Sequence, residues 1–419
     1  MKILVVGGGG REHVLVRKLK ESPRVEKIYC APGNGGISRD AECVPIAAMD
    51  LKGIVSFAKA NRIGLVVVAP DDPLAAGMVD ALEDAGIRAF GPRAKAAEIE
   101  SSKVFSKNLM KKYRIPTAGY EVFDRPDAAL AFIRERNRYP AVIKADGLAL
   151  GKGVIIASDY EEAQAGIKTI MEDKVFGASG NRVVVEEFLS GPEVSVLAFT
   201  DGKCIRPMVS SKDHKRALDG DRGPNTGGMG TISPNPYYTR ELAEQCMKEI
   251  FLPTVRAMNE EGRPFKGCLY FGLMLTSAGP KVIEYNSRFG DPEAQVVLPR
   301  LKTDLVDIME AVAEERLEQQ PIEWSEEACA CVVLASGGYP AAYRKGLEIT
   351  GLDENGQVKG ATVFHAGTVF RDGRFYTNGG RVLGVTSLGK DLPQALERAY
   401  GAVSGIHFEG AFCRHDIGK

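Results

Sequence analysis

The amino-acid sequence predicts a multidomain protein of the α/β and α+β classes. Its 419 residues exceed what one hydrophobic core usually organises, so more than one domain is expected. Apolar residues make up 44% and charged residues 26%, which is typical of globular proteins. The first hundred residues alternate continuous apolar runs with helix-like stretches, which indicates a parallel sheet covered by helices on both faces.

Residues 1–102 form the first predicted domain, an N-terminal parallel α/β domain. We expect strands at 2–6, 27–31, 64–69 and 87–90, and helices at 12–21, 50–61 and 74–85. The strands lack polar alternation, which favours strands buried on both faces. Gly91 and Pro92 stop the last strand, so the boundary is placed shortly after them.

Two further units follow, at 103–325 and 326–419. The second opens with a predicted helix at 102–113 and contains a small lobe at about 120–190, read as strand, helix, strand, Gly-rich loop, strand, helix, strand. The third is α+β in character. Its predicted elements are a strand at 330–335, hairpin-like segments at 362–370, 374–376 and 382–386, and a helix at 392–403.

Charge and composition disfavour several classes of protein. The 54 basic and 55 acidic residues give a net charge of −1, which does not favour nucleic acid or an anionic membrane as the main partner. No apolar run approaches the ~20 residues of a membrane helix. Residues 1–7 indicate a strand entering a turn rather than a signal peptide. The eight cysteines form no C-x-x-C pair, so we expect free thiols and a cytoplasmic location.

A run of four glycines at 7–10 follows the first strand and precedes a helix. Backbone amides and a helix N-terminus at such a turn can hold an anion. The run does not fit the dinucleotide pattern G-x-G-x-x-G, because Glu12 stands at the third glycine position. The second strand also offers no acidic residue for a ribose. An anion site and a turn without a ligand remain equally open, and nicotinamide chemistry is a minor alternative.

A second Gly-rich loop runs from Lys144 to Gly153, between two apolar strands. Its glycines allow backbone amides to approach phosphates closely, and Lys144 can act as a point charge on a phosphate oxygen. It is not a Walker A loop, which leads into a helix. A solvated hairpin tip is the alternative interpretation.

Two segments bring carboxylates to the ends of apolar strands. Glu186 and Glu187 are adjacent, so at most one side chain faces a given ligand. Glu284 and Asn286 are two apart and share one face, and Arg288 follows on that face if the strand continues. A carboxylate and an amide oxygen suit Mg²⁺, while Arg288 suits a carboxylate or phosphate.

The stretch 210–236 is polar and Gly-rich, and we expect it to have little regular structure. It contains His214, Lys215 and Arg216, a group suited to stabilising the charge of a transferring phosphoryl group. Long loops in compact domains are often functional. A flexible basic surface loop is the alternative.

Taken together, these segments resemble the ATP-grasp superfamily and, more closely, its glycinamide ribonucleotide synthetase (phosphoribosylamine–glycine ligase) family. The matching stretches occur in the family's order and span nearly the whole chain. They are Gly9-Gly10-Arg11-Glu12-His13, Ala31-Pro32-Gly33-Asn34, Lys144-Ala145-Asp146-Gly147-Leu148, Asp213-His214-Lys215-Arg216, Asn225-Thr226-Gly227-Gly228-Met229-Gly230 and Arg288-Phe289-Gly290-Asp291-Pro292-Glu293.

The resemblance implies an N-terminal α/β domain, an ATP-grasp core with a mobile lobe, and a C-terminal α+β domain. It implies an ATP-dependent carboxylate–amine ligase of de novo purine biosynthesis. The implied reaction joins glycine to 5-phosphoribosylamine through glycyl phosphate and gives glycinamide ribonucleotide, ADP and phosphate. ATP and Mg²⁺ or Mn²⁺ are the implied cofactors. Glycine and 5-phosphoribosylamine are the expected partners, without nucleic acid or membrane, and a monomer is compatible with the sequence.

The resemblance also implies roles for particular residues. The catalytic residues are Lys215, Arg216 and Arg288. The ATP-binding residues are Lys103, Lys144, Gly151, Gly153, Glu186, Glu187, Leu189 and Glu193. The substrate-binding residues are Gly9, Gly10, Asn34, Asp213, Asn225, Thr226, Gly290 and Asp291. The metal ligands are Glu284 and Asn286.

The chain departs from the family pattern at a few positions. Asp71 stands where the family usually has Glu, and Lys212 stands where Gln is usual. Another ATP-grasp ligase or carboxylase is kept as an alternative, which would share Lys144, Glu284 and Asn286 but not the stretches 213–216 and 288–293, and a panel of substrates decides. A catalytically inactive nucleotide-binding regulator is a third, supported by the altered segment 69–71 alone.

Overall fold

The N-terminal sheet is parallel, as predicted, in a computed structural model that describes residues 1–148 and 153–419. Its strand order is β3-β2-β1-β4-β5. The strands are β1 (Lys2–Gly7), β2 (Lys27–Pro32), β3 (Glu42–Cys43), β4 (Leu65–Val68) and β5 (Ala89–Phe90). The helices are α1 (Gly10–Lys20), α2 (Leu51–Ala60), α3 (Asp71–Ala75), α4 (Met78–Asp84) and α5 (Ala94–Ser101). β4 is buried along its whole length, which explains its unbroken apolar run.

The single helix predicted at 74–85 is wrong, because two helices occupy this stretch. α3 begins at Asp71 and ends at Ala75, and α4 begins at Met78. Gly77 separates them with a φ of 85°, a left-handed conformation that glycine adopts without steric cost. The break turns the chain and leaves Asp71 in the first turn of α3.

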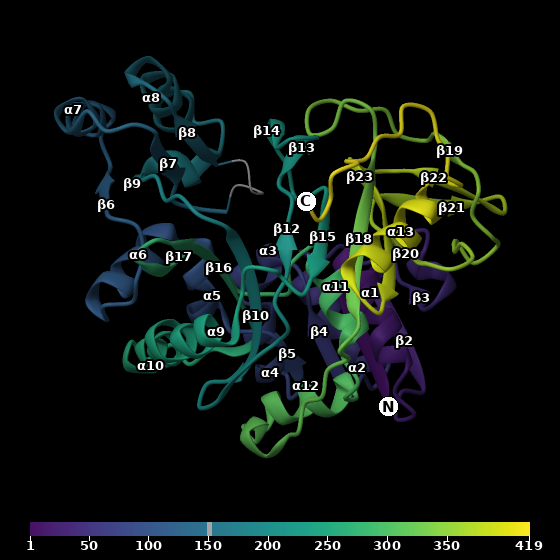
Figure 1. The fold of residues 1–419 in the computed structure, drawn as a ribbon. Helices are drawn as coiled ribbons and strands as arrows, with labels where there is room; N and C mark the ends of the chain where they lie inside the picture. Colours follow the sequence, from purple (N-terminus) through teal and green to yellow (C-terminus); the bar gives the residue numbers. More distant parts are fainter. Residues whose placement is uncertain (149–152) are drawn as a thin grey trace.

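An antiparallel sheet of order β11-β10-β16-β17 forms the middle of the molecule (Figure 1). Its strands are β10 (Glu193–Asp201), β11 (Ile205–Pro207), β16 (Lys266–Thr276) and β17 (Gly279–Asn286). The accompanying helices are α6 (Lys103–Lys112), α9 (Arg240–Cys246), α10 (Leu252–Glu260), α11 (Ala294–Val297) and α12 (Leu305–Ala313). Phe271 of β16 packs between Phe251 and Tyr285, with ring centroids 4.4 Å and 5.5 Å away. These rings belong to the hydrophobic cluster that joins α9 and α10 to one face of the sheet, whereas α11 and α12 pack in another cluster.

A separate lobe stands above α6 and β17, at the upper left of Figure 1. Its sheet has the order β6-β9-β7-β8 and its own hydrophobic cluster. The elements are β6 (Tyr120–Phe123), α7 (Pro126–Arg136), β7 (Ala141–Ala145), β8 (Val154–Ala157), α8 (Tyr160–Ile167) and β9 (Val183–Glu187). This order agrees with the order predicted for residues 120–190.

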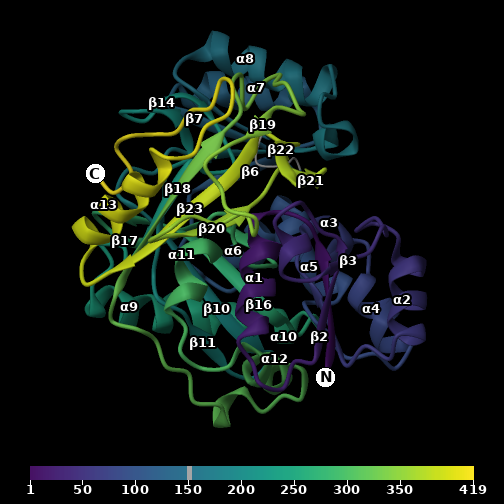
Figure 2. The ribbon, with the colours of Figure 1, turned by 90° about the vertical axis from the view of Figure 1, so that its right-hand side faces the viewer.

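The last unit contributes a sheet of order β12-β15-β18-β23-β20. Its strands are β12 (Lys212–Asp213), β15 (Gly230–Ser233), β18 (Ala328–Ala335), β20 (Thr362–His365) and β23 (Arg381–Gly389). A smaller sheet contains β19 (Glu348–Ile349), β21 (Thr368–Arg371) and β22 (Arg374–Thr377), and α13 spans Leu392–Val403, as predicted. Figure 2 shows this unit against α1. β12 and β15 lie before residue 325 and yet belong to this sheet, so hydrogen bonds cross the predicted boundary between the second and third domains. The three domain ranges stay a prediction.

The expectation of little regular structure at 210–236 is wrong. The stretch contains β12, a hairpin of β13 (Arg216–Leu218) and β14 (Arg222–Asn225), and β15. β15 pairs with β18 about a hundred residues later, and this ladder satisfies the backbone of a polar strand that is buried throughout. Among the described residues, no helix is long and apolar enough to cross a membrane.

Candidate active site

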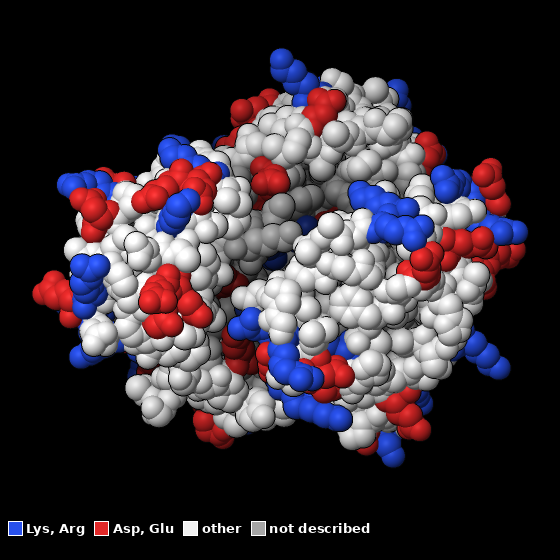
Figure 3. Space-filling model, turned by 90° about the horizontal axis from the view of Figure 1, so that it is seen from above, with Lys and Arg blue, Asp and Glu red and all other residues white. Residues whose placement is uncertain are grey.

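Three lysines from separate parts of the chain gather around Glu284. Lys215 Nζ lies 3.8 Å from Glu284 Oε1 and 3.2 Å from Glu193 Oε2. Lys144 Nζ donates to the carbonyl oxygen of the neighbouring residue Ile283 at 3.2 Å. Lys103, the first residue of α6, donates to a carbonyl of the second Gly-rich loop. Seen from above, the molecule is hollowed near its centre, with acidic and basic side chains on its walls (Figure 3).

The charges of this group act on one another. Burial raises the pKa of Glu284, but Lys215, Lys144, Lys103 and Arg288 outweigh it and hold the pKa below its usual value. Burial also lowers the pKa of Lys103, and Glu284 partly opposes that shift. Four cations thus act on Glu284, and Lys215, Lys144 and Arg288 each pair with a further acid. Such a group supplies several cations that can face a polyphosphate.

A buried ion-pair network links the lobe to α6. Glu186, at the end of β9, lies 3.1 Å from Lys144 Nζ and 2.9 Å from Lys107 Nζ, and all three side chains are buried. Burial lowers the pKa of Lys107 to about 8, although Glu186 opposes the shift. Sequence reasoning missed Lys107. Its i, i+4 spacing from Lys103 on a predicted helix was the available signal. Glu187 points the other way, toward Lys281 at 3.0 Å, as strand alternation predicts.

Arg288 lies just beyond the end of β17. The strand stops at Asn286, yet Arg288 Nη2 donates to Asn286 Oδ1 at 3.2 Å, so the two predicted site residues meet. The same nitrogen lies 3.0 Å from Glu100 Oε1 and 4.0 Å from Asp71 Oδ2. Burial lowers the pKa of Arg288, but Glu100 and Asp71 raise it further, to well above its ordinary value. The shorter acid at 71 thus stays within reach of the site.

The N-terminal glycine run packs against the segment after β17. Gly9 donates its amide to Glu12, which is buried, and Arg11 donates to the carbonyl of Phe289 at 3.1 Å. A Cβ on Gly10 would lie 2.5 Å from the Gln295 amide nitrogen, so a larger residue there would displace the Gln295 side chain. The start of α1 therefore faces residues 288–293, as expected if both belong to one site.

Asn34 uses its side chain to join three segments. Its Nδ2 donates to the carbonyls of Gly8 and His365 at 2.9 Å and 2.8 Å, and its Oδ1 accepts from the amide of Ile37 at 2.9 Å. These bonds account for both polar groups of the side chain. A substrate contact of Asn34 would therefore use its backbone or the second lone pair of Oδ1.

Asp291 is held from two sides. Gln295 Nε2 donates to its Oδ1 at 2.7 Å, and Arg381 Nη1 lies 3.4 Å from the same oxygen. Arg381 also donates to the carbonyls of Asp291 and Gly227, at 2.7 Å and 2.6 Å. Sequence reasoning missed Arg381, because it begins β23, far from the other segments, and lies in no phosphate-binding or metal-binding pattern.

The remaining predicted positions are distributed around these groups. Asp213 is in β12, and burial and the nearby Glu293 raise its pKa well above its ordinary value. Thr226 donates its amide and its hydroxyl to the Lys215 carbonyl, at 2.7 Å and 2.9 Å. The others are Gly153 (buried), Leu189 (half-buried after β9), Asn225 (end of β14) and Gly290 (buried beside Glu293). Gly151 lies outside the described residues.

The contacts of His214 do not favour the prediction that it stabilises phosphoryl charge together with Lys215 and Arg216. Its Nδ1 lies 3.1 Å from the Gly230 carbonyl, and its Nε2 accepts from the amide of Gly418 at 3.0 Å. Both ring nitrogens are therefore bound to backbone groups. Burial lowers the pKa of His214 to about 4, although the Gly230 carbonyl opposes the shift. The ring is neutral near pH 7 and fastens β15 to the segment around Gly418.

We expect His214→Gln to reduce acid destabilisation. In the wild type this pKa is about 4 folded and about 6.5 unfolded, so the unfolded state binds the proton first. Stability is then complete above pH ~6.5 and is lost as the pH falls toward 4. Gln keeps one donor and one acceptor without titrating, and should remove about 3 kcal/mol of that loss. Urea unfolding of both proteins at pH 7 and pH 4 measures it. Equal losses in both would contradict the assignment.

The fold and the site together define a protein of the ATP-grasp class. The family model for the phosphoribosylglycinamide synthetase ATP-grasp (A) domain matches residues 101–294. The models for the N domain and the C domain of the same enzyme match residues 1–100 and 329–419. The chain belongs to the phosphoribosylglycinamide synthetase family.

Individual relatives agree with this membership. The phosphoribosylamine–glycine ligase of Caldanaerobacter subterraneus subsp. tengcongensis is 50% identical over 417 residues, covering 100% of this chain and 99% of that protein. The trifunctional purine biosynthetic protein adenosine-3 of Gallus gallus is 49% identical, covering 100% of this chain and 42% of that protein.

Solved structures show the same fold. The phosphoribosylamine–glycine ligase of Thermotoga maritima has a TM-score of 0.87 at 34% identity, covering 99% of this chain and 100% of that one. The biotin carboxylase domain of Hydrogenobacter thermophilus 2-oxoglutarate carboxylase, solved with MgADP, ADP and bicarbonate, has a TM-score of 0.73 at 17% identity. It covers 98% of this chain and 91% of that chain, and shares the fold alone.

Proposed function

We propose that this chain joins glycine to 5-phosphoribosylamine, using ATP, to give glycinamide ribonucleotide, ADP and phosphate in de novo purine biosynthesis. The observation that carries the proposal is the group of cations around Glu284, in a chain of this family. The reaction has two steps, because a carboxylate oxygen is a poor leaving group until it is phosphorylated.

ATP lies, in this proposal, between the lobe and the middle sheet. Lys103 and Lys144 neutralise its phosphates, and the Glu186–Leu189 crossing and Glu193 line its adenosine. Lys144 is within ion-pair distance of Glu186 in the lobe and hydrogen-bonds the backbone beside Glu284 in the middle sheet. Its side chain therefore lies where the lobe and the middle sheet meet. This position, between the lobe and the middle sheet, favours a phosphate-binding role for Lys144.

In the first step a glycine carboxylate oxygen attacks the γ-phosphorus, and the bond from that phosphorus to the bridging oxygen of ADP breaks. Lys215 and Arg216 stabilise the charge of the transferring group, and Arg288 orients the carboxylate. In the second step the amine nitrogen attacks the carbonyl carbon of glycyl phosphate. The carbon–oxygen bond to phosphate breaks, the nitrogen loses a proton, and the amide forms. The glycine run at 7–10 and the segment 290–291 hold the substrates.

The donors at the end of β17 fit a divalent ion. Glu284 supplies a carboxylate that is held ionised by its neighbours, and Asn286 supplies an amide oxygen with a second lone pair beyond its bond to Arg288. Such hard oxygen donors suit Mg²⁺, or Mn²⁺. These two residues would hold the ion, which supplies positive charge beside the phosphates when bound.

The experiment that tests the function is ADP release measured with each substrate omitted in turn. Full release should require both glycine and 5-phosphoribosylamine, and glycinamide ribonucleotide should accumulate in equal amount. Unchanged ADP release without the amine, or with an unrelated amine, would favour another ATP-grasp ligase. ATP binding without turnover on any amine would favour an inactive regulator. We further propose that the enzyme acts in the cytoplasm on small molecules only, as a monomer.

A further inference from the structure

Lys215 and Arg216, the two cations proposed to act in phosphoryl transfer, lie at a β-hairpin that belongs to none of the larger sheets. Lys215 precedes β13, Arg216 begins it, and β13 pairs with β14 in a two-stranded sheet separate from the larger ones. The pairing shifts register between Arg216 and Leu218, and Leu218 is exposed. Isolated two-stranded hairpins are marginally stable in water. The position of these cations therefore depends on what the hairpin packs against.

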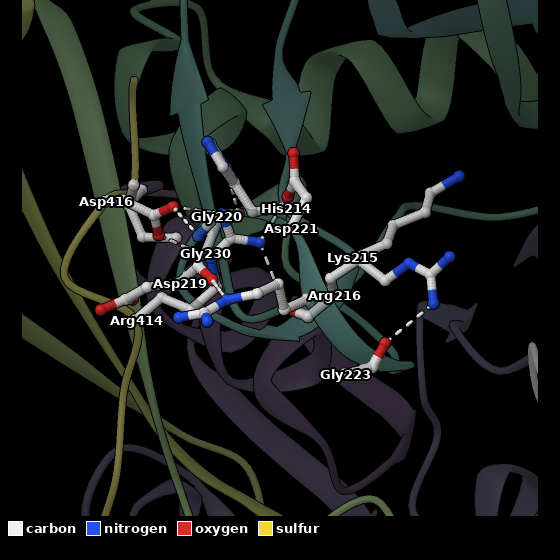
Figure 4. Close-up of polar contacts among 12 residues, drawn as sticks. His214, Lys215, Arg216, Asp219, Gly220, Asp221, Gly223, Gly230, Arg414 and Asp416 are labelled. Carbon is white, nitrogen blue, oxygen red and sulfur yellow. Dashed lines mark hydrogen bonds and ion pairs between the residues drawn. The ribbon is translucent and has the colours of Figure 1, made fainter.

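Residues 413–419, here called the clamp segment, pack against that hairpin. Arg414, only 2% exposed, lies between the two. Its Nη1 donates to the Arg216 carbonyl at 3.2 Å and lies 2.7 Å from Asp221 Oδ1. Its Nε and Nη2 donate to both carboxylate oxygens of Asp416, at 2.7 Å and 2.8 Å (Figure 4). One buried guanidinium thus binds the backbone of a proposed catalytic residue.

The turn of the hairpin is tied to the clamp segment as well. The amide of Gly220 donates to Asp416 Oδ2 at 2.7 Å. Asp219 accepts from the amide of His415 at 2.7 Å and lies 3.1 Å from its ring Nδ1. Asp416 is therefore shared between Arg414 and the turn, so the guanidinium is linked to the turn as well as to β13.

The clamp segment is itself anchored to the C-terminal unit. Tyr400 of α13 donates its hydroxyl to the Arg414 carbonyl at 2.8 Å and accepts from the amide of Ile417 at 3.1 Å. Ile417 is 2% exposed and packs with Ile232 and Ala395. The hairpin is thereby fastened to a packed helix and sheet rather than to solvent.

The side chains of Lys215 and Arg216 extend away from this anchored side (Figure 4). Lys215 reaches Glu193 at 3.2 Å and Glu284 at 3.8 Å. We propose that Arg414 is a positioning residue, which sets Lys215 and Arg216 for phosphoryl transfer by holding the Arg216 carbonyl and the hairpin turn. The proposal rests on the function proposed above. A displacement of 1 Å at such a site is enough to cost about 10²-fold in rate.

Arg414→Gln tests the proposal in the full-length enzyme. We expect kcat to fall by about tenfold or more, with the Kd for ATP within about twofold, because the clamp segment touches neither Lys103 nor Lys144. Amide hydrogen exchange of residues 214–226 should become faster. Arg344→Gln is the matched control, since it removes an exposed arginine paired with Glu409 at 2.8 Å in the same unit, and should change none of these.

A double-mutant cycle separates positioning from general stability. If Arg414 acts through Lys215 and Arg216, adding Arg414→Gln to the variant Lys215→Met/Arg216→Met should change its residual kcat by less than about twofold. Multiplied losses, or unchanged exchange at 214–226, would overturn the proposal. If Arg414→Gln has the wild-type kcat while Lys215→Met is inactive, the role proposed for Arg414 is overturned and the role of Lys215 is kept. A wild-type kcat in Lys215→Met overturns the role proposed for that lysine, and the clamp with it.

Asp416→Asn preserves the size of the side chain at 416. It gives a second test of the proposal in case Arg414→Gln does not fold. It removes the charge shared by Arg414 and Gly220. A smaller fall in kcat, with faster exchange of the Gly220 amide, is expected. Wild-type kcat and wild-type exchange together would overturn the proposal even where Arg414→Gln cannot be purified.

Discussion

Glu284→Gln is expected to lower kcat/KM by about 10²–10³-fold, the scale seen when one group that stabilises transition-state charge is removed. The substitution preserves size but removes a carboxylate that interacts with Lys215, Lys144, Lys103 and Arg288. It also replaces a charged oxygen donor for the divalent ion by a neutral one. ADP release measured against Mg²⁺ concentration should show both a lower maximum and a requirement for more Mg²⁺.

The fold should survive this change. Lys215, Lys144 and Arg288 keep ion pairs with Glu193, Glu186 and Glu100, at 3.2 Å, 3.1 Å and 3.0 Å, when Gln stands at 284. The melting temperature should therefore change by less than about 4 °C, the upper shift expected for about 1 kcal/mol in a domain of roughly 150–250 residues. Glu397→Gln, at an exposed position of α13, is the control. Wild-type Mg²⁺ dependence in Glu284→Gln would remove Glu284 from the metal site.

The N-terminal domain was largely predictable, because its signals are local. The strand expected at 27–31 is observed as Lys27–Pro32, and the helix expected at 392–403 is observed with those bounds. Continuous apolar runs and helical periodicity carry this information. The helix expected at 74–85 failed because Gly77, tolerated inside a helix at modest cost, instead adopts a left-handed conformation.

Distant pairing explains the other failure of the fold prediction. β15 is a polar and Gly-rich strand, and its partner β18 is about a hundred residues away, so local composition indicated a loop. The environment of His214 was not predictable for a similar reason, because one of its two ring nitrogens binds the amide of Gly418, far along the chain, and the other binds the Gly230 carbonyl. A titratable residue cannot be assigned to chemistry or structure before its partners are known.

The candidate site shows the same division. Glu284 and Asn286 are predicted as a pair because strand alternation places them on one face, and Lys144 is predicted because a Gly-rich loop follows it. Which of these groups face one another depends on the packing of three units. Lys107 and Arg381 carry no motif, and their importance comes from Glu186 and Asp291, which they hold. The matched family models support the assignment of the chain, whereas individual roles remain proposals.

Arg288→Met is expected to destabilise the protein by about 3–5 kcal/mol and to abolish turnover, because it leaves a buried charge unpaired. Glu100 is buried, lies 3.0 Å from Arg288 Nη2, and accepts the amide and hydroxyl of Ser287 at 2.7 Å each. Burial raises the pKa of Glu100, and Arg288 opposes that shift. Without Arg288 the carboxyl should take up a proton more readily, so the destabilisation should shrink as the pH falls.

The double variant Arg288→Met/Glu100→Gln separates stability from chemistry. Gln at 100 still accepts from Ser287 and carries no charge, so most of the lost stability should return. Turnover should not return, because no cation then orients the glycine carboxylate. Arg374→Met, which breaks an exposed pair with Glu348, should cost under about 1 kcal/mol. Recovery of both stability and turnover in the double variant would mean that Arg288 serves only to neutralise Glu100.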